Sequence, residues 1–310
     1  MAHRYQSLAG HSRPHPGRTG YRGILLAACF LTLVCVGASF GLPSASGASD
    51  AAAPPPASGL VQALTSTPIP TASPLEALGM NAIRIGYSVG GRPLEVYQFG
   101  TGASARMIVA GIHGSSEWNT IALAEELIVF LADHRQFVPG TTTLYILRSL
   151  NPDGEAQPRG ATGRPNAHGV DLNRNWPINW RPQWPRQGCW NILPTTGGPY
   201  PTSEPETEAL LDFLTYNPVE ALISYHSAAL GIFPGGSPPD PDSEDLAETL
   251  AAVSPYPYPP IDTGCLYTGM LADYASAAGI AAVDLELRTH WDTDFEQNLE
   301  VLEAFLAWEP

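Results

Sequence analysis

Lysine is absent from this chain, so its fifteen basic residues are all arginines, and they face thirty aspartates and glutamates. The formal net charge at pH 7 is −15. The first 22 residues hold four of the arginines and no acid, so the rest of the chain is more acidic still. An acidic surface repels the phosphate backbone, which argues against nucleic acid as a partner.

Long apolar runs are missing except for one, residues 23–42, which directly follows the arginine-bearing residues 1–22. A basic segment before an apolar run is typical of an export signal. The run is longer than the ~7 to 15 residues of a usual signal core and close to the ~20 that span a bilayer. We expect cleavage near Ala45, Ser46 and Ala48 and a secreted, extracytoplasmic protein. Membrane anchoring through an uncleaved segment 23–42 is the alternative.

Cysteine is also scarce, with four residues in the chain. Cys29 and Cys35 fall within the apolar run, which leaves Cys189 and Cys265. In an oxidising compartment an isolated pair is more typical of a disulfide than of a metal site. We therefore expect a disulfide between Cys189 and Cys265, with two separate buried thiols as the alternative.

The chain divides by composition into three parts. After the export segment 1–42, residues 43–75 are almost wholly Pro, Ala, Ser, Gly and Thr, which predicts a disordered linker because so little apolar surface is available for burial. Residues 76–310 have the length of one domain with a sizeable core.

Within that domain, strand patterns alternate with helix patterns. Residues 81–88 and 94–99 predict a hairpin across Gly90 and Gly91, and the apolar run 106–112 predicts a buried central strand that ends at His113. Further strands are expected at 141–150, 221–225 and 281–285, and helices at 117–133, 204–216, 242–253, 269–278 and 293–307. Ser203 and Glu206 form the pattern of a capping box. The prediction is an α/β fold in a single domain, with a mixed, largely parallel central sheet flanked by helices and binding sites at the carboxyl ends of its strands.

Polar side chains stand where three of these strands end. His113 and Glu117 follow the first buried strand, His226 ends another, and Asp284 and Glu286 lie two apart on a third. Imidazole and carboxylate are good zinc donors, and two histidines with one glutamate form a known open catalytic site. Each element alone has a structural explanation: a helix N-terminus, a buried hydrogen-bonded histidine, or an ion pair of Glu286 with Arg288.

A fourth motif is the loop that begins with Asn-Pro-Asp-Gly at residues 151–154 and continues from Arg164 to the run Asp-Leu-Asn-Arg-Asn at 171–175. An arginine fork beside an asparagine amide suits a bidentate grip on a carboxylate. A structural loop whose arginine pairs with an acid is the alternative.

Together these motifs resemble the zinc metallocarboxypeptidase family, which includes pancreatic-type carboxypeptidases and bacterial murein peptide amidases. The ordered motifs His-Glu, Asn-Pro-Asp-Gly, Asn-Arg-Asn, His-Ser and Glu-Leu-Arg span about residues 80–308. The resemblance implies that Zn²⁺ is the cofactor, that Glu286 is the general base and that Arg164 stabilises the oxyanion. The remaining implied residues are the zinc ligands His113, Glu117 and His226 and the substrate-binding residues Asn173, Arg174 and Tyr267.

The sequence departs from the family pattern at one point. Family members usually separate the first two ligands by two residues, whereas here Gly114, Ser115 and Ser116 stand between them. We expect a one-residue bulge in the turn to deliver the carboxylate all the same.

The function implied is hydrolysis of a peptide bond at the C-terminal end of a peptide. Residues 269–272 carry no charge ahead of Asp273, which favours an apolar or small terminal side chain over a basic one. The alternatives on the same scaffold are a murein γ-D-glutamyl-diaminopimelate amidase, a deacylase for small amides or esters, and a metal-free binding module. The expected partner is thus a peptide or a murein peptide.

Overall fold

The computed structural model describes Leu75, Gly79 and residues 82–184, 195–228 and 231–310, which belong to one compact unit, Ser66–Pro310. The export segment, residues 43–74 of the expected linker and Cys189 lie outside the described residues, so cleavage, anchoring and the disulfide stay predictions. Leu75, which we assigned to the end of the linker, is 2% exposed and belongs to the hydrophobic core. In the described part of the chain, no helix is both long and apolar enough to cross a bilayer.

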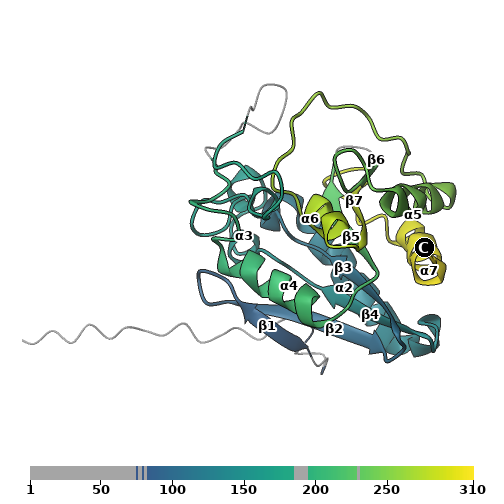
Figure 1. Cartoon of the computed structure of the whole chain (residues 1–310). Helices are drawn as coiled ribbons and strands as arrows, with labels where there is room; N and C mark the ends of the chain where they lie inside the picture. The colour runs from purple at the N-terminus through teal and green to yellow at the C-terminus, as the bar shows by residue number, and fades with distance from the viewer. Residues whose placement is uncertain (1–74, 76–78, 80–81, 185–194, 229–230) are drawn as a thin grey trace, which may run out of the picture. The chain divides into compact units, whose positions relative to one another are not determined.

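The centre of the domain is a seven-stranded sheet with the order β1-β2-β4-β3-β5-β7-β6 (Figure 1). The four strands β4, β3, β5 and β7 are parallel, and β1, β2 and β6 run antiparallel to their neighbours. The strands are β1 Ile83–Tyr87, β2 Pro93–Gly100, β3 Ser104–Val109, β4 Thr142–Leu147, β5 Ala221–Ser227, β6 Gly231–Pro234 and β7 Ala281–Leu287. The predicted mixed, largely parallel sheet is confirmed.

Helices cover both faces of this sheet, as the alternation along β3 shows. Ile108 and Ala110 pack into one apolar cluster with α2, α5 and α7, whereas Met107 and Val109 pack into another with α4 and α6. The helices are α2 Trp118–Asp133, α4 Pro205–Tyr216, α5 Pro241–Ala252, α6 Leu271–Ala277 and α7 Phe295–Ala307, with the short α3 Pro152–Glu155. Because both faces are covered, the central strands are largely apolar, and the polar residues of β5 and β7 lie toward their carboxyl ends.

Two predicted details are wrong. The central strand β3 ends at Val109 and not at His113, because Gly111 takes a φ of +63° that turns the chain out of the sheet. The capping box at Ser203 does not form, because Pro205 occupies the first turn of α4 and Glu204 is the N-cap residue. The Glu206 carboxylate instead accepts hydrogen bonds from the Val89 N–H and the Asn166 amide.

Candidate metal centre

His113 and Glu117 are held by a single 3₁₀ turn, η1 Gly114–Glu117, which leads into α2. Gly114 opens this turn with a φ of +48°, a conformation that glycine adopts without steric cost. The turn brings His113 Nδ1 to 2.7 Å from Glu117 Oε1, and both side chains are buried. The three-residue spacing therefore places both groups at one point, through a 3₁₀ turn where we expected a bulge.

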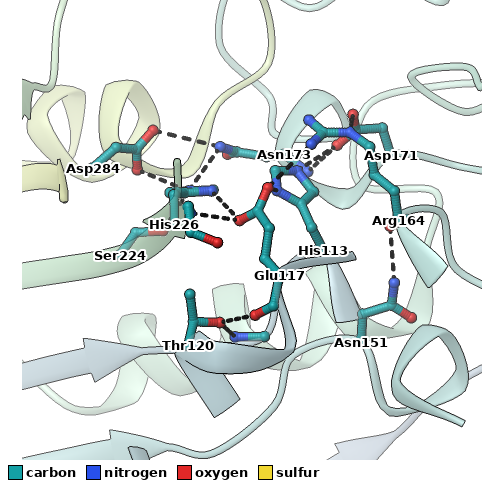
Figure 2. A network of polar contacts seen from close by, with 12 residues as sticks. His113, Glu117, Thr120, Asn151, Arg164, Asp171, Asn173, Ser224, His226 and Asp284 are labelled. Atoms are coloured by element: carbon teal, nitrogen blue, oxygen red, sulfur yellow. Dashed lines mark hydrogen bonds and ion pairs between the residues drawn. The ribbon is translucent and has the colours of Figure 1, made fainter. Parts of the chain in front are cut away.

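His226 reaches the same point from β5, the strand that pairs in parallel with β3. Its Nδ1 lies 3.2 Å from Glu117 Oε2, and its ring centroid lies 4.9 Å from that of His113. One ligand atom from each of the three residues lies within 4.8 Å of the others. Figure 2 shows both rings directed at the Glu117 carboxylate. The three residues converge closely enough to share one metal ion.

The outer nitrogens of both rings have partners of their own. His113 Nε2 lies 3.1 Å from Asp171 Oδ1. His226 Nε2 lies 3.1 Å from Ser224 Oγ and 3.5 Å from Asp284 Oδ1 (Figure 2). A ligating histidine usually donates its second N–H to such an acceptor, which fixes the ring and leaves the other nitrogen for the metal. Both Nδ1 atoms are thus oriented toward Glu117, and the donor set of two imidazoles and one carboxylate fits Zn²⁺.

The charges of this cluster are strongly coupled. Burial alone would raise the pKa of Glu117, but the charges and hydrogen bonds of His113 and His226 outweigh it and hold that pKa well below its usual value. Burial would lower the pKa of His226, but Asp284 and Glu117 raise it well above its usual value. Opposite charges therefore stabilise one another at the metal position.

The other predicted site residues line the same cavity, which has a volume of about 300 Å³. Glu286 lies on β7 directly opposite His226 in the β5–β7 ladder. Asp284 lines the cavity with Glu286, which confirms that the two acids share one face of the strand. Arg288, our alternative partner for Glu286, is instead bound by Asp294 at 2.6 Å.

Arg164 and Arg174 approach from the long loop that follows α3. Arg164 Nε donates to Asp171 Oδ2 at 2.9 Å and its Nη1 to Glu117 Oε1 at 3.2 Å, which places its guanidinium beside the metal position. Arg174 is 4% exposed, and its Nη1 donates to the backbone carbonyl of Asn173. Its Nε is buried without a hydrogen-bond partner among the described residues. A buried donor of this kind is costly unless a ligand accepts from it.

Asn173 and Tyr267 complete the predicted set. Asn173 Oδ1 accepts from the Leu271 N–H, and its Nδ2 lies between His226 Nε2 and Asp284 Oδ2, at 3.3 and 3.4 Å. The Tyr267 ring lies 5.4 Å from the guanidinium carbon of Arg174 and its hydroxyl bonds Thr263. Both side chains line the cavity, and Asn173 also contacts His226 and Asp284.

Two buried acids of the site were not among the predicted functional residues. Asp171 is fully buried, and its carboxylate binds both His113 and Arg164. Burial would raise its pKa, but Arg164 and His113 hold it well below its usual value. Asp284 stands between His226 and Asn173. The only sequence signals were the position of Asp171 inside the Asp-Leu-Asn-Arg-Asn run and that of Asp284 two residues before Glu286.

Known proteins are similar in sequence to about half of this chain. The chain is 31% identical to mouse carboxypeptidase A1 over 190 residues, covering 54% of this chain and 45% of that protein. It is 30% identical to murein peptide amidase A of Escherichia coli over 151 residues, covering 47% and 55%. The chain thus spans about half the length of the curated relatives it matches.

Solved structures agree on the fold. Bovine thrombin-activatable fibrinolysis inhibitor, in complex with a tick carboxypeptidase inhibitor, superimposes with a TM-score of 0.60 at 22% identity, covering 75% of this chain and 91% of that one. The family model for zinc carboxypeptidase matches residues 79–295, a stretch that contains both histidines, the strand-end carboxylates and the arginine loop. On this match, the chain belongs to the zinc carboxypeptidase family.

Proposed function

We propose that this protein is a zinc-dependent carboxypeptidase that hydrolyses the last amide bond of a peptide. The observation that carries the proposal is the convergence of His113, Glu117 and His226 on one point at the wall of a cavity that also holds Glu286 and Arg174. Metal ligands, a carboxylate base and an anion-binding arginine are the parts that such a reaction needs. A structural metal site would have no use for the last two.

The residues divide the chemistry between them. When bound, Zn²⁺ at this position would lower the pKa of a water molecule and polarise the scissile carbonyl. Glu286 accepts the proton of the attacking water and passes it to the departing amide nitrogen, so that the C–N bond breaks with release of a neutral amine. Arg164, fixed by Asp171, donates to the carbonyl oxygen as negative charge develops there.

Arg174 defines which end of the peptide is recognised. Its Nε points at no acceptor among the described residues, and the faces of Trp184 and Tyr267 lie 5.3 and 5.4 Å from its guanidinium carbon. The free carboxylate of a terminal residue would satisfy it with a bidentate pair. This requirement restricts cleavage to the last residue.

Replacement of Glu286 by Gln tests the proposal. Gln keeps the shape but cannot accept the proton, so we expect full zinc content with kcat lowered by roughly 10² to 10⁴. The measurement is peptide hydrolysis together with zinc content by atomic absorption, and Glu300→Gln, an exposed residue of α7, is the matched control. If Glu286→Gln turns over peptide at the wild-type rate, Glu286 is not the base; if the purified domain takes up no zinc, the metal-free binding module replaces the enzyme.

A murein γ-D-glutamyl-diaminopimelate amidase is the second candidate, favoured by the similarity to the Escherichia coli murein peptide amidase A. It would use the same groups, since its product also carries a terminal carboxylate. The two activities differ in the residue on the acyl side of the bond. Comparing a murein tripeptide with an α-linked peptide of the same terminal residue separates them.

A further inference from the structure

The cavity holds more negative charge than the proposed reaction uses. Beyond the metal position and Arg174, it is lined by Asp273 of α6 and Asp284 of β7. Asp284 is 4% exposed, and its Oδ1 has no hydrogen-bond partner among the described residues. Asp273 Oδ1 accepts from the Gly236 N–H, and Asp284 Oδ2 accepts from the Asn173 amide at 3.4 Å. The cations near the two acids are the His226 ring, whose Nε2 lies 3.5 Å from Asp284 Oδ1, and Arg174, whose charge lowers the pKa of Asp273. The proposed function assigns His226 to the metal and Arg174 to the terminal carboxylate, so a cationic ligand would stabilise the two buried acids further.

The two acids lie close enough to interact. The charges of Asp284 and Arg174 both change the pKa of Asp273. Burial first, and then the charge of Asp284, raise the pKa of Asp273 above its usual value, while Gly236 and Arg174 lower it. The charge of Asp284 disfavours the ionised form of Asp273, and a cation bound beside Asp273 would favour it.

The rest of the wall fits the stem of a long side chain. Phe233 and Pro234 of β6 and Met270, which caps α6, line the same cavity. Phe233 is the register partner of Asp284 in the β6–β7 ladder. Lysine-like side chains are usually buried with the aliphatic stem against apolar residues and the charged head at a carboxylate.

We propose that Asp273 and Asp284 select a C-terminal residue whose side chain carries an ammonium or guanidinium group. The inference rests on the proposed function and names its substrate class: lysine, ornithine, arginine or diaminopimelate at the end of the peptide. It replaces the expectation of an apolar or small terminal side chain, which considered only the residues that precede Asp273 in the sequence. Arg174 holds the α-carboxylate and the two aspartates hold the side-chain cation.

A second role for Asp284 has to be separated from this one, because its Oδ1 also lies 3.5 Å from His226 Nε2. If Asp284 served only to orient the metal ligand, its loss would lower zinc retention and would slow all substrates by the same factor. If it selects the side chain, its loss changes the ratio between substrates. The ratio is therefore the decisive readout.

The experiment compares two N-acylated dipeptides that end in lysine and in norleucine, which differ by one amino group on a similar stem. With the zinc-loaded wild type we expect kcat/KM to favour lysine by about 10² or more, because a site built for a hydrogen-bonding group rejects the analogue that lacks it. Asp273→Asn and Asp284→Asn should each lower this ratio at least tenfold. Asp212→Asn, the same charge change at an exposed position of α4, should leave the ratio at its wild-type value.

Each outcome decides a separate question. If the wild-type enzyme cleaves the norleucine and lysine peptides with equal kcat/KM, the inference is overturned and the proposed function is left intact. An unchanged ratio in Asp284→Asn with reduced zinc content assigns Asp284 to His226 alone and removes it from the selection. If neither peptide is cleaved, calorimetric binding of both peptides to the zinc-loaded protein decides: tighter binding of the lysine peptide supports the charge selection while the proposed hydrolysis fails, and equal or absent binding overturns both.

Discussion

Asp171 contacts both His113, a proposed metal ligand, and Arg164, the proposed oxyanion residue, so Asp171→Asn perturbs them together. Its carboxylate accepts from Arg164 Nε at 2.9 Å and from the Asn173 N–H at 3.0 Å, and it contacts His113 Nε2 at 3.1 Å. Asn can accept two of these bonds, but its NH₂ group must then face the third donor. Arg164 keeps its ion pair with Glu117 at 3.2 Å.

The expected loss follows from these contacts. Removing the support of a ligating histidine lowers metal affinity about 10- to 100-fold, which corresponds to roughly 1.4 to 2.7 kcal/mol. The metal-free protein should also lose about 3 kcal/mol of unfolding free energy, the lower end of the cost of breaking a buried ion pair, because Glu117 still contacts Arg164. Because the folded pKa of Asp171 is depressed, this stabilisation is present above its unfolded pKa of about 3.9 and is lost as the pH falls through the folded pKa.

Zinc competition against a chromophoric chelator and urea unfolding of the metal-free protein measure the two effects. Asp240→Asn is the control, since Asp240 Oδ2 caps α5 through the Ser243 N–H and Asn caps a helix as well as Asp. It carries the same charge change and should alter stability by less than about 0.5 kcal/mol. Zinc affinity of Asp171→Asn within twofold of the wild type, with unchanged circular dichroism, would refute the reasoning.

Two further predictions concern the metal position. Because the pKa of His226 is raised, protons compete with the metal for its ring, and zinc affinity should fall as the pH is lowered through that pKa. Calorimetry in buffers of different ionisation enthalpy should therefore show proton release on zinc binding. A zinc affinity that does not depend on pH contradicts this prediction. Gly114→Ala should weaken zinc binding by at least tenfold, because the added methyl group would lie 2.6 Å from the Gly154 carbonyl carbon and the residue would be strained at its φ of +48°. Gly140→Ala, where nothing lies within 4 Å of the added methyl group, is its control.

Much of the fold could be predicted because its signals are local. The apolar runs of the parallel strands and the helical spacing of α2 follow from burial on both faces of the sheet, and the structure confirms each of these elements within a few residues. The errors arise where a single residue overrides the pattern. Gly111 ends β3 early through its positive φ, and Pro205 fixes the start of α4 so that Glu204, one residue after the expected Ser203, is the N-cap.

The convergence of the proposed metal ligands could be predicted for a similar reason, since parallel strands end at one edge of the sheet and His113 and His226 stand at or just beyond two such ends. What could not be predicted is which acid supports which ring. Asp171 comes from a loop 58 residues after His113. Asp284 meets His226 through the pairing of β5 with β7, which single-sequence patterns do not reveal. The charge selectivity that we propose did not follow from the sequence, because Asp273 and Asp284 come from α6 and β7 and meet only in the folded cavity.

The two halves of the site differ in how their geometry is fixed. His226 and Glu286 are direct partners in the β5–β7 ladder, and Ser224 and Asp284 are partners two residues earlier on the same face. Because side chains alternate along a strand, a slip of one residue would move all four groups away from the cavity, and the buried apolar residues between them oppose that slip. His113 and Glu117 depend instead on one 3₁₀ turn that starts at Gly114. Substitutions in that turn should therefore lower metal affinity gradually, without abolishing it. Substitutions on β7 should instead alter which substrate is accepted and whether it is cleaved.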